Sequence, residues 1–199
     1  MPRLVAVCAV NRLRSDAGAV GVTAIDKVVV DGAVKIGSYG VYADVQADRK
    51  HHGGLDKALY AYGEEDAAYW AEQLGRDLPP GWFGENLRTE GIDVNAALVG
   101  ERWRIGDRVE VEVTMPRTPC QTFARWVGGA DERGWVRRFS EERRLGPYLR
   151  VLVTGRVAAD DEITVTHRPE GAPTILDIYR GPQRASAALR RNGERPMGA

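Results

Sequence analysis

Valines alternate with charged residues from Arg108 to Val113, a period of two that marks a half-buried β-strand. The turn residues Gly106-Asp107 separate this strand from another strand-like run at 102–105. β-Branched runs also occupy 3–10 and 22–30, and the Asp31-Gly32 pair after the latter predicts a hairpin with residues 33–36. The chain is therefore expected to pair many short strands.

One helix stands out between these runs. Apolar side chains recur at the i, i+3, i+4 and i+7 positions of one helical face, at Ala67, Trp70, Ala71 and Leu74. Two glutamates precede them, where negative charge suits the helix dipole, and Pro79-Pro80 forbids continuation. A second helix is expected within 131–144, with Gly134 as a weak point.

These patterns favour a mainly β (α+β) fold, a β-barrel-like domain with a few decorating helices. Further strands are expected at 148–154 and 162–167. The strict βαβ alternation of a Rossmann sheet is absent. We assign residues 1–168 to this domain and residues 169–199 to a short C-terminal helical or irregular tail.

Composition narrows the class of function. Lys plus Arg and Asp plus Glu both total 28, and this zero net charge argues against a nonspecific nucleic-acid binder. No apolar run is long enough to span a bilayer, and the run at 4–10 lacks a signal-peptide cleavage site. A cytoplasmic protein is expected. The two cysteines, Cys8 and Cys120, are too few for a disulfide scaffold.

Two glycine-bearing segments are candidates for ligand contact. His51-His52-Gly53-Gly54 offers backbone amides and donors for an anion, although a tight turn with exposed histidines is the favoured alternative. In 81–87, Asn86 can both donate to and accept from a heterocycle, but it can equally cap a turn. Three acids, Asp26, Asp44 and Asp48, are interpreted as solvated or capping residues of turns.

The segment 115–122 places Cys120 directly after the alternating strand, in a loop that Pro116 and Pro119 stiffen. Arg117 can lower the pKa of this thiol or hold an anionic ligand. A thiolate suits a soft metal or sulfur chemistry. The alternative is a buried, inert cysteine, which Cys8 in its apolar strand fits better. No Cys-x-x-Cys pair indicates zinc, and no Gly-x-Ser-x-Gly elbow indicates a serine hydrolase.

Taken in order, five segments of the chain resemble the MOSC domain, the C-terminal domain of molybdenum-cofactor sulfurase, and in particular its YiiM-like branch. They are Thr23–Lys27, Gln46–Ala58, Phe83–Leu87, Pro116–Cys120 and Gly146–Leu152. Each is weak alone, but together in register they form a specific signal. The branch usually carries a three-helix C-terminal extension, and only about 30 residues follow His167 here, so this element is expected to be shortened or absent.

The resemblance implies a MOSC-type β-barrel that binds a molybdenum cofactor, with Cys120 as the thiolate ligand of molybdenum. It also implies that Lys27 pairs with the cofactor phosphate and that His52 and Asn86 hydrogen-bond the pterin. Arg117 and Thr122 are added because they neighbour the cysteine. At the level of the family, pyridoxal phosphate binding is implied as well.

The activity expected from this resemblance is reduction of N-hydroxylated compounds of the hydroxylaminopurine type. A separate electron-donor protein is expected, because the sequence has neither an iron–sulfur cysteine cluster nor a flavin fingerprint. The substrate would be a small molecule, and the chain a monomer or homodimer. Two alternatives remain open: a carrier of persulfide sulfur or of the molybdenum cofactor, and a binding module whose cysteine is structural.

Overall fold

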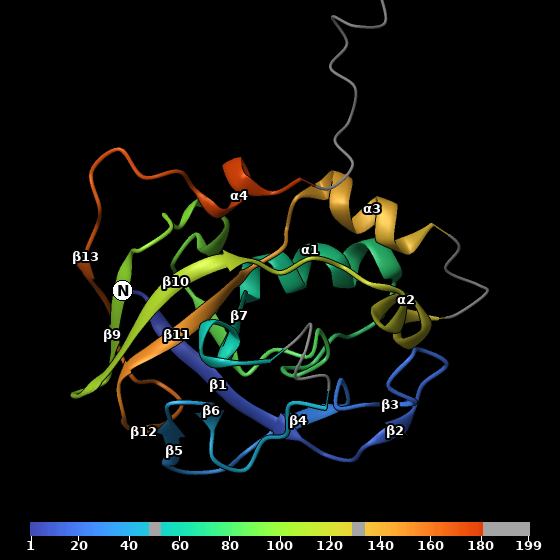
Figure 1. Cartoon of the computed structure of the whole chain (residues 1–199), viewed down its shortest axis with the longest axis horizontal. Coiled ribbons are helices and arrows are strands. Elements are labelled where there is room, and N and C mark those ends of the chain that lie inside the picture. Colours follow the sequence, from blue (N-terminus) through green and yellow to red (C-terminus); the bar gives the residue numbers. More distant parts are fainter. Residues whose placement is uncertain (48–52, 129–133, 181–199) are drawn as a thin grey trace, which may run out of the picture.

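The computed structural model describes residues 1–47, 53–128 and 134–180. In Figure 1 the large sheet lies on the left, while α1 (Glu64–Leu74), α2 (Gln121–Val127) and α3 (Trp135–Glu142) gather on the right. A fourth helix, α4 (Ile175–Ile178), follows the last strand. Within the described ranges, no helix is long and apolar enough to cross a membrane.

The large sheet has eight strands in the order β13-β9-β10-β11-β7-β8-β1-β4. Their bounds are β1 (Arg3–Val10), β4 (Lys27–Val29), β7 (Leu59–Gly63), β8 (Leu87–Glu90), β9 (Arg102–Ile105), β10 (Val109–Pro116), β11 (Pro147–Val153) and β13 (Ile163–His167). Neighbours are antiparallel except β7 and β8, which run parallel.

This sheet is strongly curled. Its β1 strand meets the start of β13 at an isolated bridge between Arg3 and Glu162, where the Leu4 amide donates to the Asp161 carbonyl at 2.8 Å. The prediction of a mainly β (α+β) fold is confirmed. In the part of the chain that the structure describes, however, the strand ladders do not form a fully closed barrel.

Smaller elements cover the rim of the sheet. One three-stranded sheet has the order β12 (Gly155–Val157), β5 (Val34–Gly37), β6 (Gly40–Val41), and a two-stranded hairpin joins β2 (Arg14–Ser15) to β3 (Val22–Thr23). Two 3-10 turns, η1 (Leu55–Lys57) and η2 (Val94–Ala96), complete the fold.

Two hydrophobic cores stabilise these layers. Inside the curled sheet, Val109, Val111 and Val113 are buried, because the period-two pattern of β10 turns every second side chain inward. Beneath the helices lies an aromatic core that includes Trp70, Phe83, Phe123, Trp135 and Phe139. Phe123 contacts Phe139 edge-on with ring centroids 5.1 Å apart, a geometry that aromatic pairs favour.

Local sequence patterns predicted most of these elements. The predicted helix is confirmed as residues 64–74, and the two strands on either side of Gly106-Asp107 are confirmed as β9 and β10. The prediction of a hairpin at Asp31-Gly32 is wrong, because β4 pairs with β1, and β5 pairs with β12 and β6. The run at 22–30 is split into the short strands β3 and β4, and residues 34–36 lie in β5. Distant partners, and not the Asp31-Gly32 turn, decide how β4 and β5 pair.

The expected C-terminal tail contributes to both cores. Ile175 is fully buried in the sheet core, and Tyr179 is buried in the aromatic core. The Tyr179 hydroxyl donates to Ser140 Oγ at 2.7 Å. The boundary at residue 168 stays a prediction, and residues 181–199 lie outside the described ranges.

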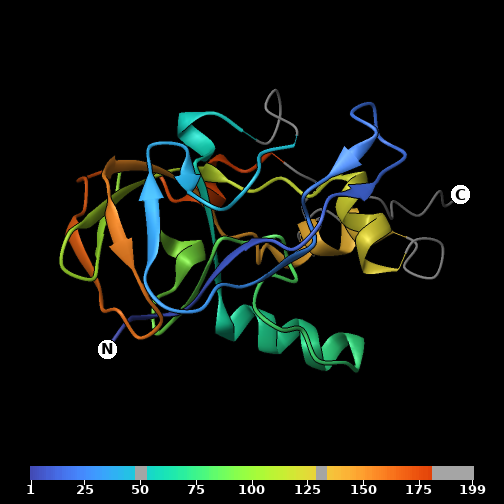
Figure 2. The ribbon, with the colours of Figure 1, turned by 90° about the horizontal axis from the view of Figure 1, so that it is seen from below.

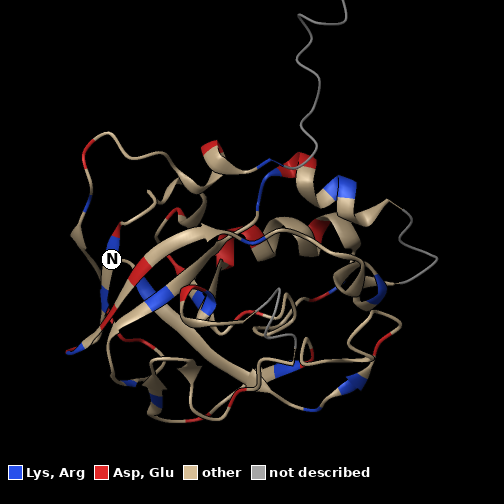
Figure 3. Ribbon diagram, in the orientation of Figure 1, with Lys and Arg blue, Asp and Glu red and all other residues tan. Residues whose placement is uncertain are grey.

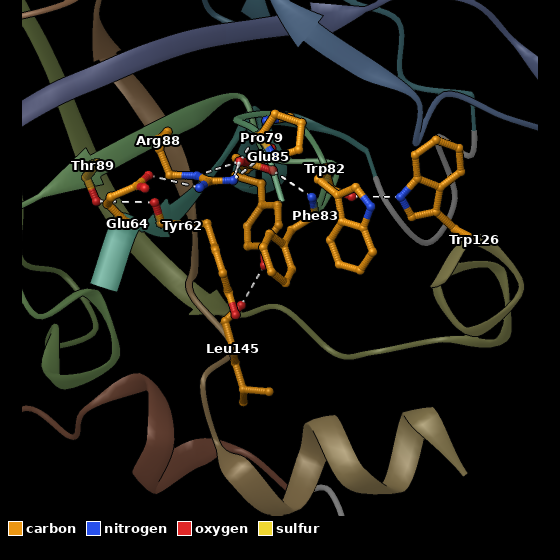
Figure 4. Close-up of polar contacts among 12 residues, drawn as sticks. Tyr62, Glu64, Pro79, Trp82, Phe83, Glu85, Arg88, Thr89, Trp126 and Leu145 are labelled. Carbon is orange, nitrogen blue, oxygen red and sulfur yellow. Dashed lines mark hydrogen bonds and ion pairs between the residues drawn. The ribbon is translucent and has the colours of Figure 1, made fainter. Parts of the chain in front are cut away.

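A buried ion pair holds the segment that leads into β8 (Figure 4). Glu85 and Arg88 have no exposed side-chain surface and lie 2.6 Å apart. Arg88 also donates to Glu64 at 3.0 Å and to the Pro79 carbonyl at 3.2 Å. The Glu85 carboxylate in turn accepts the backbone amide of Phe83 at 3.0 Å. This network fixes the position of residues 79–88.

We expect Glu85→Ala to lower the free energy of unfolding by about 3–5 kcal/mol, because it leaves the buried Arg88 charge without its nearest partner. Urea unfolding measures this loss. The matched control is Glu90→Ala, which removes a pair with Arg3 whose side chains are 43% and 44% exposed, and it should cost less than about 1 kcal/mol. Equal losses in the two variants would contradict the assignment.

A polar clasp joins the β2–β3 hairpin to α2, two segments that lie side by side in both Figure 1 and Figure 2. Asp16 accepts from Thr122 Oγ1 at 2.9 Å and from Arg125 Nε and Nη2 at 2.8 and 2.7 Å. The Arg125 guanidinium, with Thr122 and the Gly18 amide, lowers the pKa of Asp16 from near 3.8 to about 2. The clasp therefore stabilises the ionised carboxylate.

Asp16→Asn should lower the melting temperature at pH 7. A carboxyl whose pKa is depressed on folding stabilises the native state above its unfolded pKa, and the contribution disappears as pH falls through the folded pKa. The difference between wild type and variant should therefore shrink below pH 3.8 and vanish as the pH falls below about 2. Thermal unfolding monitored by circular dichroism across this range checks it, and a pH-independent difference would oppose the clasp.

Candidate functional site

One cavity of about 430 Å³ lies between the β2–β3 hairpin, the sheet and the loop that joins β10 to α2. Five predicted site residues line it, namely Lys27, Asn86, Arg117, Cys120 and Thr122. They come from segments nearly a hundred positions apart in the sequence. The sixth, His52, lies outside the described residues.

Cys120 sits at the N-cap of α2 in an extended conformation, immediately after the loop that leaves β10. It is half-buried and lines the cavity. Cys8 is different, because burial within β1 raises the pKa of its thiol to about 12 and keeps it protonated. The structure therefore gives the two cysteines opposite environments, as their sequence contexts predicted.

Arg117 is a buried cation with unusual surroundings. The residue is 5% exposed, and its guanidinium carbon lies 4.0 Å from the ring centroid of Phe123 and 5.2 Å from that of Tyr60. Nη1 is buried and has no hydrogen-bond partner. None of the described carboxylates forms an ion pair with Arg117. A guanidinium stays protonated at neutral pH, so this charge lies in the cavity wall without a carboxylate counter-ion among the described residues.

Lys27 and Asn86 belong to a compact polar cluster centred on Asp44. Lys27 Nζ forms an ion pair with Asp44 Oδ2, and both side chains are at most 10% exposed. The Asn86 amide donates to Asp44 at 2.7 Å and to the Cys8 carbonyl at 3.2 Å, while its oxygen accepts the Tyr60 amide at 3.2 Å. The roles predicted for Lys27 and Asn86 toward a cofactor stay predictions.

Thr122 also has a partner inside the protein. Its hydroxyl donates to Asp16 in the clasp, so its hydrogen points toward the hairpin in this conformation. Arg14 of the same hairpin lies over the Trp126 ring at 5.1 Å, which adds a second contact between hairpin and helix. The hairpin forms one wall of the cavity.

The cavity wall carries more positive than negative charge. Four lining side chains are cationic, Lys27, Lys57, Arg117 and Arg125, whereas two are acidic, Asp16 and Asp44. In Figure 3, β2, β4 and α2 each include a positively charged segment. Such a site favours an anionic ligand. No group of three or more described His, Cys, Asp or Glu side chains could hold a metal ion.

Sequence reasoning misjudged two acids, Asp44 in the cavity lining and Asp26 outside it. Asp44 was interpreted as a solvated or capping turn residue, but its side chain is only 10% exposed and contacts Lys27 and Asn86. Asp26 was interpreted in the same way, yet it is 6% exposed and accepts from Arg12 and Arg14. Both gain their partners only through long-range folding, and nothing in the local pattern distinguishes them from exposed turn acids.

Comparisons with known proteins agree with this architecture. The MOSC domain profile matches residues 48–164. YflK of Bacillus subtilis is 34% identical over 148 residues, and YiiM of Escherichia coli is 32% identical over 150 residues. These alignments cover 74% and 73% of this chain, and the chain spans 65% of the length of each relative. A protein from Gibberella moniliformis named "Reductase" is 29% identical over 168 residues, which cover 79% of this chain and 28% of that protein.

The fold has a counterpart among solved structures. The crystal structure of YiiM from Geobacillus stearothermophilus superposes with a TM-score of 0.70 at 26% identity, over 88% of this chain and 80% of that chain. The family profile covers more than half of the present sequence, from the β7 side of the cavity through Cys120 to β13. The chain thus belongs to the MOSC-domain family, as a YiiM-like member.

Proposed function

We propose that this protein binds a molybdenum–pterin cofactor in the cavity and reduces N-hydroxylated compounds there, with the sulfur of Cys120 as a ligand of the metal. The observation that carries the proposal is that Cys120 and Arg117 line the same cavity. A half-buried thiol lies beside a buried guanidinium that has no acid partner among the described residues.

The residues present fit such a cofactor. The ligand would be an anion with a phosphate group, and four cationic side chains against two acidic ones line the cavity. A thiolate is the soft ligand that a thiophilic metal prefers. The cavity of about 430 Å³ lies within the size range of sites for small organic ligands.

The chain's own residues have distinct tasks in this proposal. Cys120 holds the metal, and the net positive charge of the cavity wall attracts the anionic groups of the cofactor. The β2–β3 hairpin, closed onto α2 by Asp16, limits the access of water. When bound, the cofactor supplies the redox chemistry, while the protein supplies position and charge.

The overall reaction requires an external reductant. Conversion of a hydroxylamine R–NHOH to the amine R–NH₂ consumes two electrons and two protons and releases water. A separate electron-donor protein is proposed as their source, with a small molecule as substrate. The relative named "Reductase" supports oxidoreductase activity only in general terms, because the match covers 28% of that protein.

A carrier function is the second candidate. Cys120 is half-buried at the cavity wall, and a reachable thiol is all that transfer of persulfide sulfur requires. The same site could hand on the molybdenum cofactor without turnover of its own. Pyridoxal phosphate, which is expected at the level of the family, would meet the same cationic wall, and its binding stays a prediction.

Molybdenum and pterin content of protein from a cofactor-producing host tests the proposal. Wild type should contain stoichiometric molybdenum, and Cys120→Ser should lower the content by about tenfold or more because a metal ligand is lost. The matched control is Cys8→Ala, whose thiol is buried in β1 away from the cavity, and its molybdenum content should equal that of wild type.

Turnover separates the enzyme from the carrier. The loaded protein with a chemical reductant should convert a hydroxylaminopurine to the aminopurine, and Cys120→Ser should not. Sulfane sulfur on Cys120 without bound metal would instead favour the carrier. Equal and negligible molybdenum in wild type and Cys120→Ser would overturn the cofactor assignment.

A further inference from the structure

Three cations of the cavity wall differ in whether an acid neutralises them. Lys27 is paired with Asp44, and Arg125 is paired with Asp16. Arg117 has no carboxylate partner among the described residues, even though the residue is buried, with 5% of its surface exposed. Of these three charges, only the one on Arg117 is left for a ligand to balance.

The protein contains an internal comparison for Arg117. Arg88 is also buried, but Glu85, Glu64 and the Pro79 carbonyl accept its hydrogen bonds (Figure 4). Arg88 therefore has the environment of a structural arginine. Arg117 has two aromatic rings beside it and a buried Nη1 without an acceptor.

Two aromatic faces compensate only part of the desolvation of a guanidinium. An unpaired buried charge destabilises the native state unless a counter-charge is bound. Because surrounding protein screens charge weakly, an anion at this wall would be attracted more strongly than at the surface. The desolvation that makes the Arg117 charge destabilising without a bound anion also makes this residue an effective anion receptor.

We propose that Arg117 is the anion-recognition residue of the cavity, holding an anionic oxygen group of the ligand beside Cys120, and that Lys27 serves as the structural partner of Asp44. The identity of that ligand rests on the proposed function, but the recognition of an oxyanion does not. The family resemblance alone implies that Lys27 pairs with a phosphate of the ligand. Because Asp44 already neutralises Lys27, we assign this pairing to Arg117.

The Lys27–Asp44 pair fits this structural role. Asp44 accepts the Val10 amide at 2.9 Å and the Asn86 amide at 2.7 Å, so it joins the end of β1 to the entrance of β8. Lys27 neutralises this buried carboxylate. A ligand anion that bound Lys27 would have to compete with the Asp44 carboxylate. A ligand anion that bound Arg117 would not have to displace a described carboxylate.

The test uses the full-length chain from a host that does not make the cofactor, with inorganic phosphate as probe. Melting temperature is followed against phosphate at constant ionic strength, with chloride as the reference anion. Phosphate should stabilise wild type, and Arg117→Met should weaken the apparent affinity by about tenfold or more. Without phosphate, Arg117→Met should melt at the same temperature or about 2–4 °C higher, because a buried unpaired charge is removed.

The control is the double variant Lys27→Met/Asp44→Asn, which removes the internal pair without leaving either charge alone. It should bind phosphate within about threefold of wild type, as expected for a site that does not include Lys27. Arg117→Lys keeps the charge without the planar fork and should retain part of the affinity. Wild-type affinity in Arg117→Met, lost affinity in the double variant, or no phosphate effect on wild type would each overturn the inference.

Cofactor content separates this inference from the proposed function. Protein from the cofactor-producing host is assayed for molybdenum and for oxidised pterin fluorescence. Arg117-dependent phosphate binding in a wild type that contains neither would sustain the inference and reject the proposed function. Equal cofactor content in wild type and Arg117→Met would reject the inference and leave the proposed function intact.

Discussion

The Asn86 side-chain amide connects the segments on which the cavity depends. Its oxygen accepts the Tyr60 amide of β7, and its nitrogen donates to the Cys8 carbonyl of β1 and to Asp44. Asp44 in turn holds Lys27 at the start of β4. An aspartate at position 86 could accept the first bond but could not donate the other two. The Glu85–Arg88 network beside it fixes the backbone that carries this amide.

At position 117, the residue that would best stabilise the fold differs from the residue that is present. A buried guanidinium is tolerated at Arg88 because acids and a carbonyl surround it, and this arrangement rigidifies the loop before β8. The Arg117 guanidinium lies between Tyr60 and Phe123, and its Nη1 has no acceptor. This arrangement does not stabilise the protein without a bound anion. Natural proteins break such a local rule mainly at functional sites. The exception therefore points to the cavity and not to the core.

Local patterns were enough to predict α1, β9, β10 and β13, because burial on one face imposes a period of 3.6 or 2 on the sequence. The same reasoning could not pair β4 with β1, since register depends on partners distant in the chain. It also missed α2, whose seven residues are too few for a clear period. For the site, the sequence identified Cys120 and its neighbours, but not Asp16 or Asp44, whose partners come from other elements.

The cavity also extends beyond the part of the chain that the family profile matches. Residues 48–164 contribute Tyr60, Arg117 and Cys120, whereas Asp16, Lys27 and Asp44 belong to the preceding segment. The first group forms the wall on which the chemistry is proposed, next to the aromatic core. The second group contacts the rest of the lining through Asp16 with Thr122 and Asp44 with Asn86, and its segment is also paired into the sheet through β1 and β8. A family profile alone therefore leaves out three charged side chains of the cavity lining, and only the folded structure brings them into the same lining as Cys120 and Arg117.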